Sequence, residues 1–122
     1  MPIEELYKIT ANEKTSEGIS ATVHLNKDHA IFKGHFPENP VMPGVCMIQI
    51  IKELTEEAIG KTLFLSVSSN IKFMAIINPE KNPNLNLIID IAEENGEVKV
   101  KNTTSFDETV ALKMGATFKI VD

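Results

Sequence analysis

The sequence predicts an α+β fold in which an antiparallel β-sheet wraps around a long central α-helix. One long and strongly apolar segment with helical spacing begins near residue 44, whereas most of the chain after it alternates between apolar and polar residues. A helix this apolar belongs in the interior, so the strands have to enclose it. The 122 residues are expected to form one domain, 1–122, with a core of its own.

The first third of the chain predicts one clear strand and one long loop. Ile3–Ile9 is a short stretch that fits either a strand or a single helical turn. Residues 19–25 alternate between apolar and polar side chains, which predicts a half-buried strand. Asp28–Met42 is expected to be a loop, because its prolines lack backbone donors and restrict the residues before them.

The central helix has recognisable start and stop signals. Pro43-Gly44 marks its beginning, since proline is favoured near the first helical turn. Gly60 is a plausible stop just after the last residue of the helical pattern. The apolar face is predicted from residues with helical spacing, namely Met47, Ile50, Ile51, Leu54 and Ala58.

The remainder of the chain predicts strands. Leu63–Phe73 and Leu85–Glu93 are expected as two of them. Asn95-Gly96 is a two-residue hairpin signal, because both turn positions need a positive φ, and the return strand begins at Val98. Residues 110–120 then alternate without a break, which predicts a further strand.

Composition excludes several classes of function. The net charge is −5, and the 12 basic residues are all lysines, which argues against a nucleic-acid partner. No apolar run approaches the roughly 18 residues that a membrane span needs, and the first residues do not resemble a secretory signal. The single cysteine, Cys46, has no internal partner and fits a reducing compartment, so a cytoplasmic location is expected.

Two polar residues stand out as candidate site residues. His35 lies in a loop stiffened by three prolines, and its ordinary pKa suits proton transfer near neutrality. Gln49 is the one polar residue in the apolar run 45–51. The plainer alternatives are a structural histidine that bonds a loop carbonyl and a buried glutamine satisfied by the backbone.

The other reactive side chains predict structural roles. His24 is expected on the polar face of a strand and His29 in a turn beside Asp28. Neither has ligands at metal-binding spacing, so no metal site is expected. Cys46 is expected to be a small core residue, because a nucleophilic cysteine needs an activating base nearby.

The stretches Phe32-Lys33-Gly34-His35-Phe36-Pro37 and Pro40-Val41-Met42-Pro43-Gly44-Val45 resemble the signature of the beta-hydroxyacyl-(acyl carrier protein) dehydratases, which have the hotdog fold. The resemblance implies that His35 is catalytic and that the Gly44 amide polarises the thioester carbonyl. It also implies a carboxylate on the helix 14 residues after the histidine, where this chain has Gln49. Glu53 and Glu38 are the nearest candidates to replace it, although solvated charge is the commoner fate of such residues.

The resemblance implies a lyase of fatty acid biosynthesis that eliminates water to give a trans-2-enoyl thioester. The substrate would be carried on the phosphopantetheine of acyl carrier protein or coenzyme A, with no other cofactor. The protein would be a homodimer or a trimer of dimers, with His35 of one subunit facing Gln49 of the other. Because Gln49 cannot transfer a proton, a hotdog acyl thioesterase and a non-catalytic acyl-thioester binding module are the alternatives. The acyl chain is expected to contact Phe36, Pro43, Val45, Ile48 and Phe73.

Overall fold

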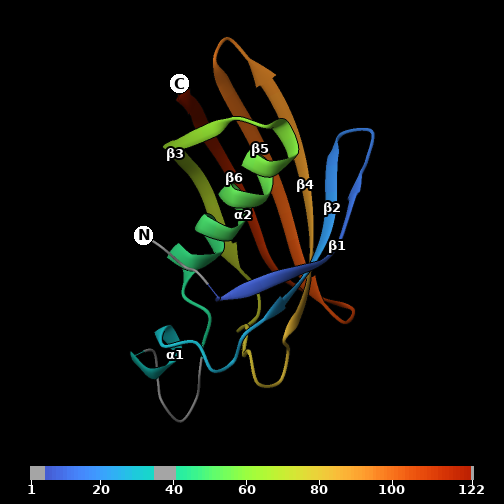
Figure 1. Ribbon diagram of the computed structural model, residues 1–122, viewed down its shortest axis with the longest axis vertical. Helices are drawn as coiled ribbons and strands as arrows, with labels where there is room; N and C mark the ends of the chain where they lie inside the picture. Colours follow the sequence, from blue (N-terminus) through green and yellow to red (C-terminus); the bar gives the residue numbers. More distant parts are fainter. Residues whose placement is uncertain (1–4, 35–40, 122) are drawn as a thin grey trace.

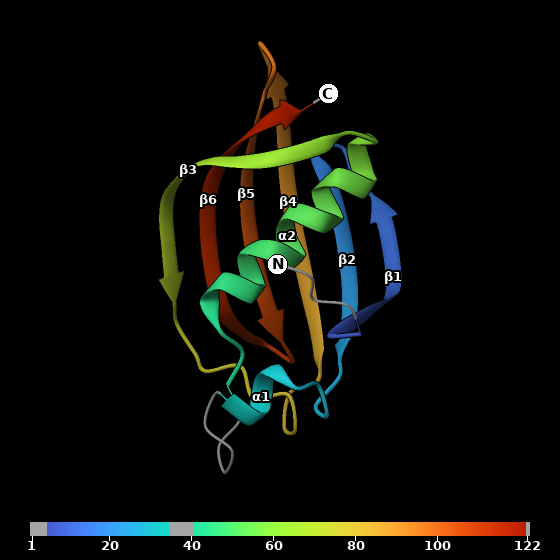
Figure 2. The same cartoon turned by 60° about the vertical axis from the view of Figure 1, so that its left-hand side comes forward.

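A six-stranded antiparallel sheet curls around one long helix, which crosses its concave face (Figures 1 and 2). The computed structural model describes residues 5–34 and 41–121. The strands lie in the order β1-β2-β4-β5-β6-β3, so β1 and β3 are the two edges of the sheet. The predicted α+β architecture is therefore confirmed.

The long helix and the strands from residue 18 onward follow the predicted pattern closely. Their bounds are β1 Tyr7–Lys14, β2 Gly18–Leu25, α1 Ile31–Gly34, α2 Gly44–Ile59, β3 Thr62–Phe73, β4 Asn84–Glu94, β5 Glu97–Phe106 and β6 Thr109–Val121. The long helix and the strands after it each begin within one residue of the position that the sequence predicts. No helix in this described part of the chain is long and apolar enough to cross a membrane.

Two predictions for the first third of the chain need correction. For Ile3–Ile9 the sequence leaves both a strand and a single helical turn open, and the structure has a strand that runs over Tyr7–Lys14, with most of its side chains exposed. An edge strand held mainly by its backbone pairing with β2 leaves no alternating pattern to read. The expected loop Asp28–Met42 contains the short helix α1.

The core lies between α2 and the concave face of the sheet. The predicted apolar face of α2 is buried at Met47, Ile50, Ile51 and Leu54, while Ala58 is half-buried. The strands supply the opposite side of the core through alternate residues, as in β2, where Ile19, Ala21, Val23 and Leu25 are buried. The apolar residues that alternate along the strands and those with helical spacing on α2 thus pack together in one core.

The two ends of α2 are held by backbone contacts. Pro43 is the N-cap residue, with φ −67° and ψ 146°. Just before it, the Met42 N–H donates to the Ile77 carbonyl at 2.9 Å, which ties the start of the helix to the β3–β4 connection. Gly60 ends the helix in the left-handed region at φ 68°, and its N–H donates to the Glu56 carbonyl at 2.8 Å. The start of the helix is therefore tied to the connection between β3 and β4.

Gly18, at the start of β2, lies where a side chain would run into the backbone of β4. A Cβ atom added there would lie 1.9 Å from the carbonyl oxygen of Ile89. The neighbouring Glu17 carbonyl accepts a hydrogen bond of 2.8 Å from the Ile91 N–H. Backbone packs directly against backbone at this position, which only glycine allows.

Candidate active site

The first turn of α2 presents backbone donors. The Cys46 and Met47 N–H groups donate to the Pro43 carbonyl at 3.1 and 3.2 Å. The amides of Gly44 and Val45 precede this contact, and the geometry of a helix gives such leading amides no intrahelical acceptor. Together with the positive end of the helix dipole, they can stabilise negative charge on an oxygen atom.

Gly44 lets an aromatic ring approach this helix end. A Cβ atom added at Gly44 would lie 3.2 Å from Cε2 of Phe73, at the end of β3. The Phe73 side chain is 46% exposed and Val45 is 62% exposed. The amides therefore lie beside exposed apolar side chains, a setting that suits the carbonyl end of an acyl chain.

The exposed apolar surface continues along the open edge of the sheet. Ile71 and Phe73 on β3 pair with Met114 and Leu112 on β6, which are buried. Directly paired residues share a face of the sheet, so Ile71 and Phe73 face the helix side even though they remain partly exposed. We call Val45, Ile71 and Phe73 the apolar edge patch.

A chain of polar side chains begins one turn into α2. The Nε2 atom of Gln49 donates to Oε2 of Glu53 at 2.9 Å, and the Tyr7 hydroxyl donates to Oε1 of Glu53 at 2.8 Å. All three side chains are half-buried. Within the described residues, the hydrogen bond of the Gln49 side chain therefore goes to a carboxylate on its own helix.

Tyr7 acts in this chain as a hydrogen-bond donor. Burial raises the pKa of the Tyr7 hydroxyl, and its hydrogen bond to Glu53 and the negative charges of Glu53, Glu57 and Glu56 raise it further. The phenol consequently keeps its proton throughout the neutral range. Tyr7 was not among the predicted site residues, because its contact joins residues 46 positions apart in the chain. Glu53, in contrast, has a local signal, since residues four apart share a helix face.

The structure brings most of the predicted site residues to one region. Gly44, Val45, Gln49 and Phe73 lie around the first two turns of α2, whereas Pro43 is buried. Ile48 is half-buried and packs against the core. His35 and Phe36 lie outside the described residues, so the predicted contact between His35 and Gln49 stays a prediction.

The remaining histidines and the cysteine have structural roles. His29 lies in a turn, where its N–H donates to the Asn26 carbonyl and its Nδ1 accepts from the Ile31 N–H, both at 3.1 Å. His24 is half-buried on β2, with its Nδ1 2.7 Å from Oδ1 of Asn84. Cys46 is fully buried, which raises the pKa of its thiol. Within residues 5–34 and 41–121, no group of three or more His, Cys, Asp and Glu side chains is placed to hold a metal ion.

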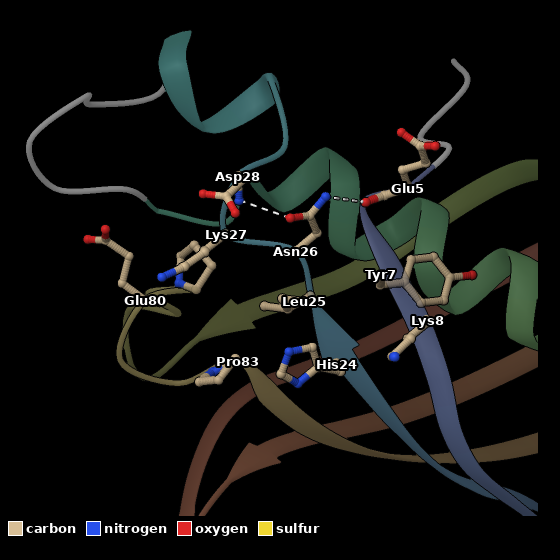
Figure 3. A pocket seen from close by; sticks show the side chains of 11 residues that line it. Glu5, Tyr7, Lys8, His24, Leu25, Asn26, Lys27, Asp28, Glu80 and Pro83 are labelled. Atoms are coloured by element: carbon tan, nitrogen blue, oxygen red, sulfur yellow. Dashed lines mark hydrogen bonds between the residues drawn. The ribbon is translucent and has the colours of Figure 1, made fainter.

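A pocket of about 580 Å³ lies elsewhere, between the start of β1, the end of β2 and the β3–β4 connection (Figure 3). Its charged lining residues are of both signs, Glu5, Lys8, Lys27, Asp28 and Glu80, and none of its lining residues comes from α2. Tyr7 lines it but directs its hydroxyl to Glu53. This mixed lining does not favour an acyl chain over any other ligand.

Comparisons with known proteins identify related sequences. The family model of the ApeI-like proteins, described as ApeI dehydratase, matches residues 10–113. The 3-hydroxyacyl-[acyl-carrier-protein] dehydratase FabZ of Lactobacillus helveticus is 31% identical, with 87% of this chain and 76% of the relative covered. FabZ of Rickettsia massiliae is 30% identical, and the alignment covers 98% of this chain and 85% of the relative.

A comparison with solved structures identifies a protein of similar fold. The dehydratase heterocomplex ApeI:P from Xenorhabdus doucetiae matches with a TM-score of 0.75 at 19% identity, covering 92% of this chain and 96% of the matched chain. At this identity the match supports the fold, and it agrees with the curled sheet and single long helix of the hotdog fold.

Proposed function

Because the chain belongs to the ApeI-like dehydratase family and is related to the 3-hydroxyacyl-[acyl-carrier-protein] dehydratases, we propose that it removes water from a 3-hydroxyacyl thioester to give the trans-2-enoyl thioester. The observation that carries the proposal is the start of α2. There, the amides of Gly44 and Val45 lie beside the exposed ring of Phe73, directly after the motif that contains His35.

The proposed mechanism follows from these groups. The Gly44 and Val45 amides donate to the thioester oxygen, which acidifies the C2 proton by stabilising the enolate. The His35 imidazole removes that proton, the C3–O bond breaks and the C2–C3 double bond forms. The departing hydroxide takes the proton back from the imidazolium, directly or through one water, and leaves as water. Gln49 transfers no proton and binds the 3-hydroxyl by a hydrogen bond.

The substrate is proposed to arrive on a phosphopantetheine arm, either of acyl carrier protein or of coenzyme A. No cofactor takes part in the elimination as proposed. Val45, Phe73 and the half-buried Ile48 would contact the acyl chain, with Phe36 and the buried Pro43 nearby in the sequence. The unpaired, buried Cys46 supports a cytoplasmic location.

A second copy of this chain is proposed to cover the open edge. β3 is an edge strand, and it carries Ile71 and Phe73 of the apolar edge patch at 36% and 46% exposure. An edge strand with apolar side chains is open to pairing with another chain. We propose a homodimer through β3, in which His35 of one subunit faces Gln49 of the other.

Replacing Ile71 by lysine is expected to shift the protein from dimer to monomer, because it puts a charge into the apolar edge patch. Light scattering on a size-exclusion column measures the mass. Phe64→Lys is the matched control: Phe64 lies on the same strand and is 63% exposed, but it pairs with the exposed Lys119 on the opposite face of the sheet. Equal dimer loss in both variants would contradict an interface on the helix side of β3.

One assay tests the function itself. The protein is incubated with 3-hydroxyacyl and saturated acyl thioesters while enoyl absorbance and free thiol are followed. Enoyl product supports the proposal. Thiol release without enoyl product would identify a thioesterase, and saturable binding without either signal would identify a binding module.

Replacing Gln49 by glutamate is expected to raise the rate of enoyl formation about tenfold or more, because a positioned acid typically contributes about 10²–10⁴-fold. The introduced carboxyl would take the place of the Gln49 carboxamide beside Glu53 and would supply the acid that Gln49 lacks for the leaving hydroxyl. The measurement is kcat against pH. Gln49→Met, similar in length but apolar, is the control and is expected to lose activity. An unchanged rate in the glutamate variant would mean that position 49 does not face the leaving group.

A further inference from the structure

We propose that Glu53 is a positioning residue: it holds the Gln49 carboxamide in one orientation, with Oε1 of Gln49 as the acceptor offered to the 3-hydroxyl of the substrate. Tyr7 in turn fixes Glu53. The catalytic part of this inference rests on the proposed dehydratase function, whereas the contact between Glu53 and Gln49 does not.

Both carboxylate oxygens of Glu53 are used. Oε2 accepts from Nε2 of Gln49 at 2.9 Å and Oε1 accepts from the Tyr7 hydroxyl at 2.8 Å. The two donors come from different elements, α2 and β1 (Figure 3 shows Tyr7 on β1 beside α2). A carboxylate held at both oxygens by separate elements has little freedom to rotate, so its position is defined by the fold.

The carboxylate decides which way the Gln49 amide points. A carboxylate accepts hydrogen bonds and offers no proton, so its neighbour at 2.9 Å has to be the amide nitrogen. The reverse orientation would bring the amide oxygen against a negative oxygen and leave both without a donor. Oε1 of Gln49 is therefore directed away from Glu53.

This orientation gives Gln49 a definite chemical role. The 3-hydroxyl of a hydroxyacyl thioester carries a proton that it can donate, and Oε1 of Gln49 is an acceptor. A hydrogen bond between them would align the C3–O bond for departure, and orientation of this kind affects kcat strongly. Tyr7 contributes as a permanent donor, which keeps Glu53 in place without exchanging a proton.

The kinetic test compares Glu53→Ala and Glu53→Gln. The alanine variant is expected to lower kcat about tenfold while KM changes less than about twofold, because alignment is lost and binding is kept. The glutamine variant keeps an oxygen that accepts from Nε2 of Gln49, and it is expected to retain at least about a third of the wild-type kcat. Glu57→Ala, which removes an exposed carboxylate from the same helix, is the matched control and is expected to leave kcat unchanged.

A double variant separates positioning from direct catalysis. If Glu53 acts through Gln49, adding Glu53→Ala to a Gln49→Ala protein has no further effect on kcat. A further tenfold loss in that background, or a Glu53→Gln variant as slow as Glu53→Ala, would overturn the proposal and make Glu53 itself the reacting group. Thermal melts of every variant check that the fold is retained.

A spectroscopic readout does not need turnover. The side-chain amide of Gln49 is assigned in a ¹H–¹⁵N spectrum by its loss in Gln49→Ala. One amide proton is expected to be shifted downfield by the carboxylate, and this shift is expected to disappear in Glu53→Ala. An amide signal that does not respond to Glu53→Ala would overturn the proposal. If wild-type protein makes no enoyl product, the proposed function fails, and the amide signal still decides whether Glu53 holds Gln49.

Discussion

Replacing His35 by alanine is expected to lower kcat/KM for enoyl formation by about 10²–10⁴-fold. In the proposed mechanism this imidazole takes the C2 proton and returns it to the leaving oxygen, and Gln49 can take over neither step. In the single chain both carboxylate oxygens of Glu53 already accept a hydrogen bond, so Glu53 is a poor substitute for His35. Initial rates of enoyl formation from a 3-hydroxyacyl thioester measure the effect.

His24→Ala provides the matched control for this prediction. It removes the imidazole of His24 from β2. This ring is hydrogen-bonded to the side chain of Asn84 and takes no part in the proposed chemistry. Its rate is expected to stay within about twofold of wild type, as for surface changes away from the site. Full turnover in the His35→Ala protein would remove His35 from the mechanism.

Replacing Gly18 by alanine is expected to lower the free energy of unfolding by about 3 kcal/mol or more, at the upper end of what overpacking costs. The added methyl group would lie 1.9 Å from the Ile89 carbonyl oxygen and 3.1 Å from the Ile91 nitrogen. These are backbone atoms, so relief requires the pairing of β2 with β4 to shift. Urea unfolding followed by circular dichroism measures the change.

Gly60→Ala is the comparison that isolates the steric effect. At Gly60 an added Cβ meets nothing within 4 Å, and the cost comes from φ 68°, about 1 kcal/mol. An equal loss of stability in both variants would mean that the contact with Ile89 relaxes at little cost.

The sequence predicts most of the fold because its strongest signals are local. Pro43-Gly44 and Gly60 bracket α2 as predicted, and Asn95-Gly96 forms the predicted turn with φ of 53° and 77°. The alternation in residues 110–120 is visible because β6 has one buried face. β1 could not be predicted in this way, because its side chains are mostly exposed and do not alternate between apolar and polar. Its backbone hydrogen bonds with β2 do not depend on the identity of its side chains.

The site was predictable where it depends on one element. Gly44, Val45 and Gln49 follow from the motif and the start of a single helix. The link from Tyr7 to Glu53 depends on how β1 passes α2, and nothing in the local sequence of either residue indicates the other. The proximity of Phe73 to Gly44 likewise depends on tertiary packing between β3 and α2.

The strand order β1-β2-β4-β5-β6-β3 also constrains how the chain folds. The β4–β5 and β5–β6 hairpins close short loops and are able to form early, whereas pairing β2 with β4 and β3 with β6 closes long ones. The residues of the proposed site that the structure describes lie on α2 and on the two edge strands, which carry Tyr7 and Phe73, and these late closures bring them together. A partly folded intermediate could therefore possess a native β-meander and still lack any organised catalytic centre.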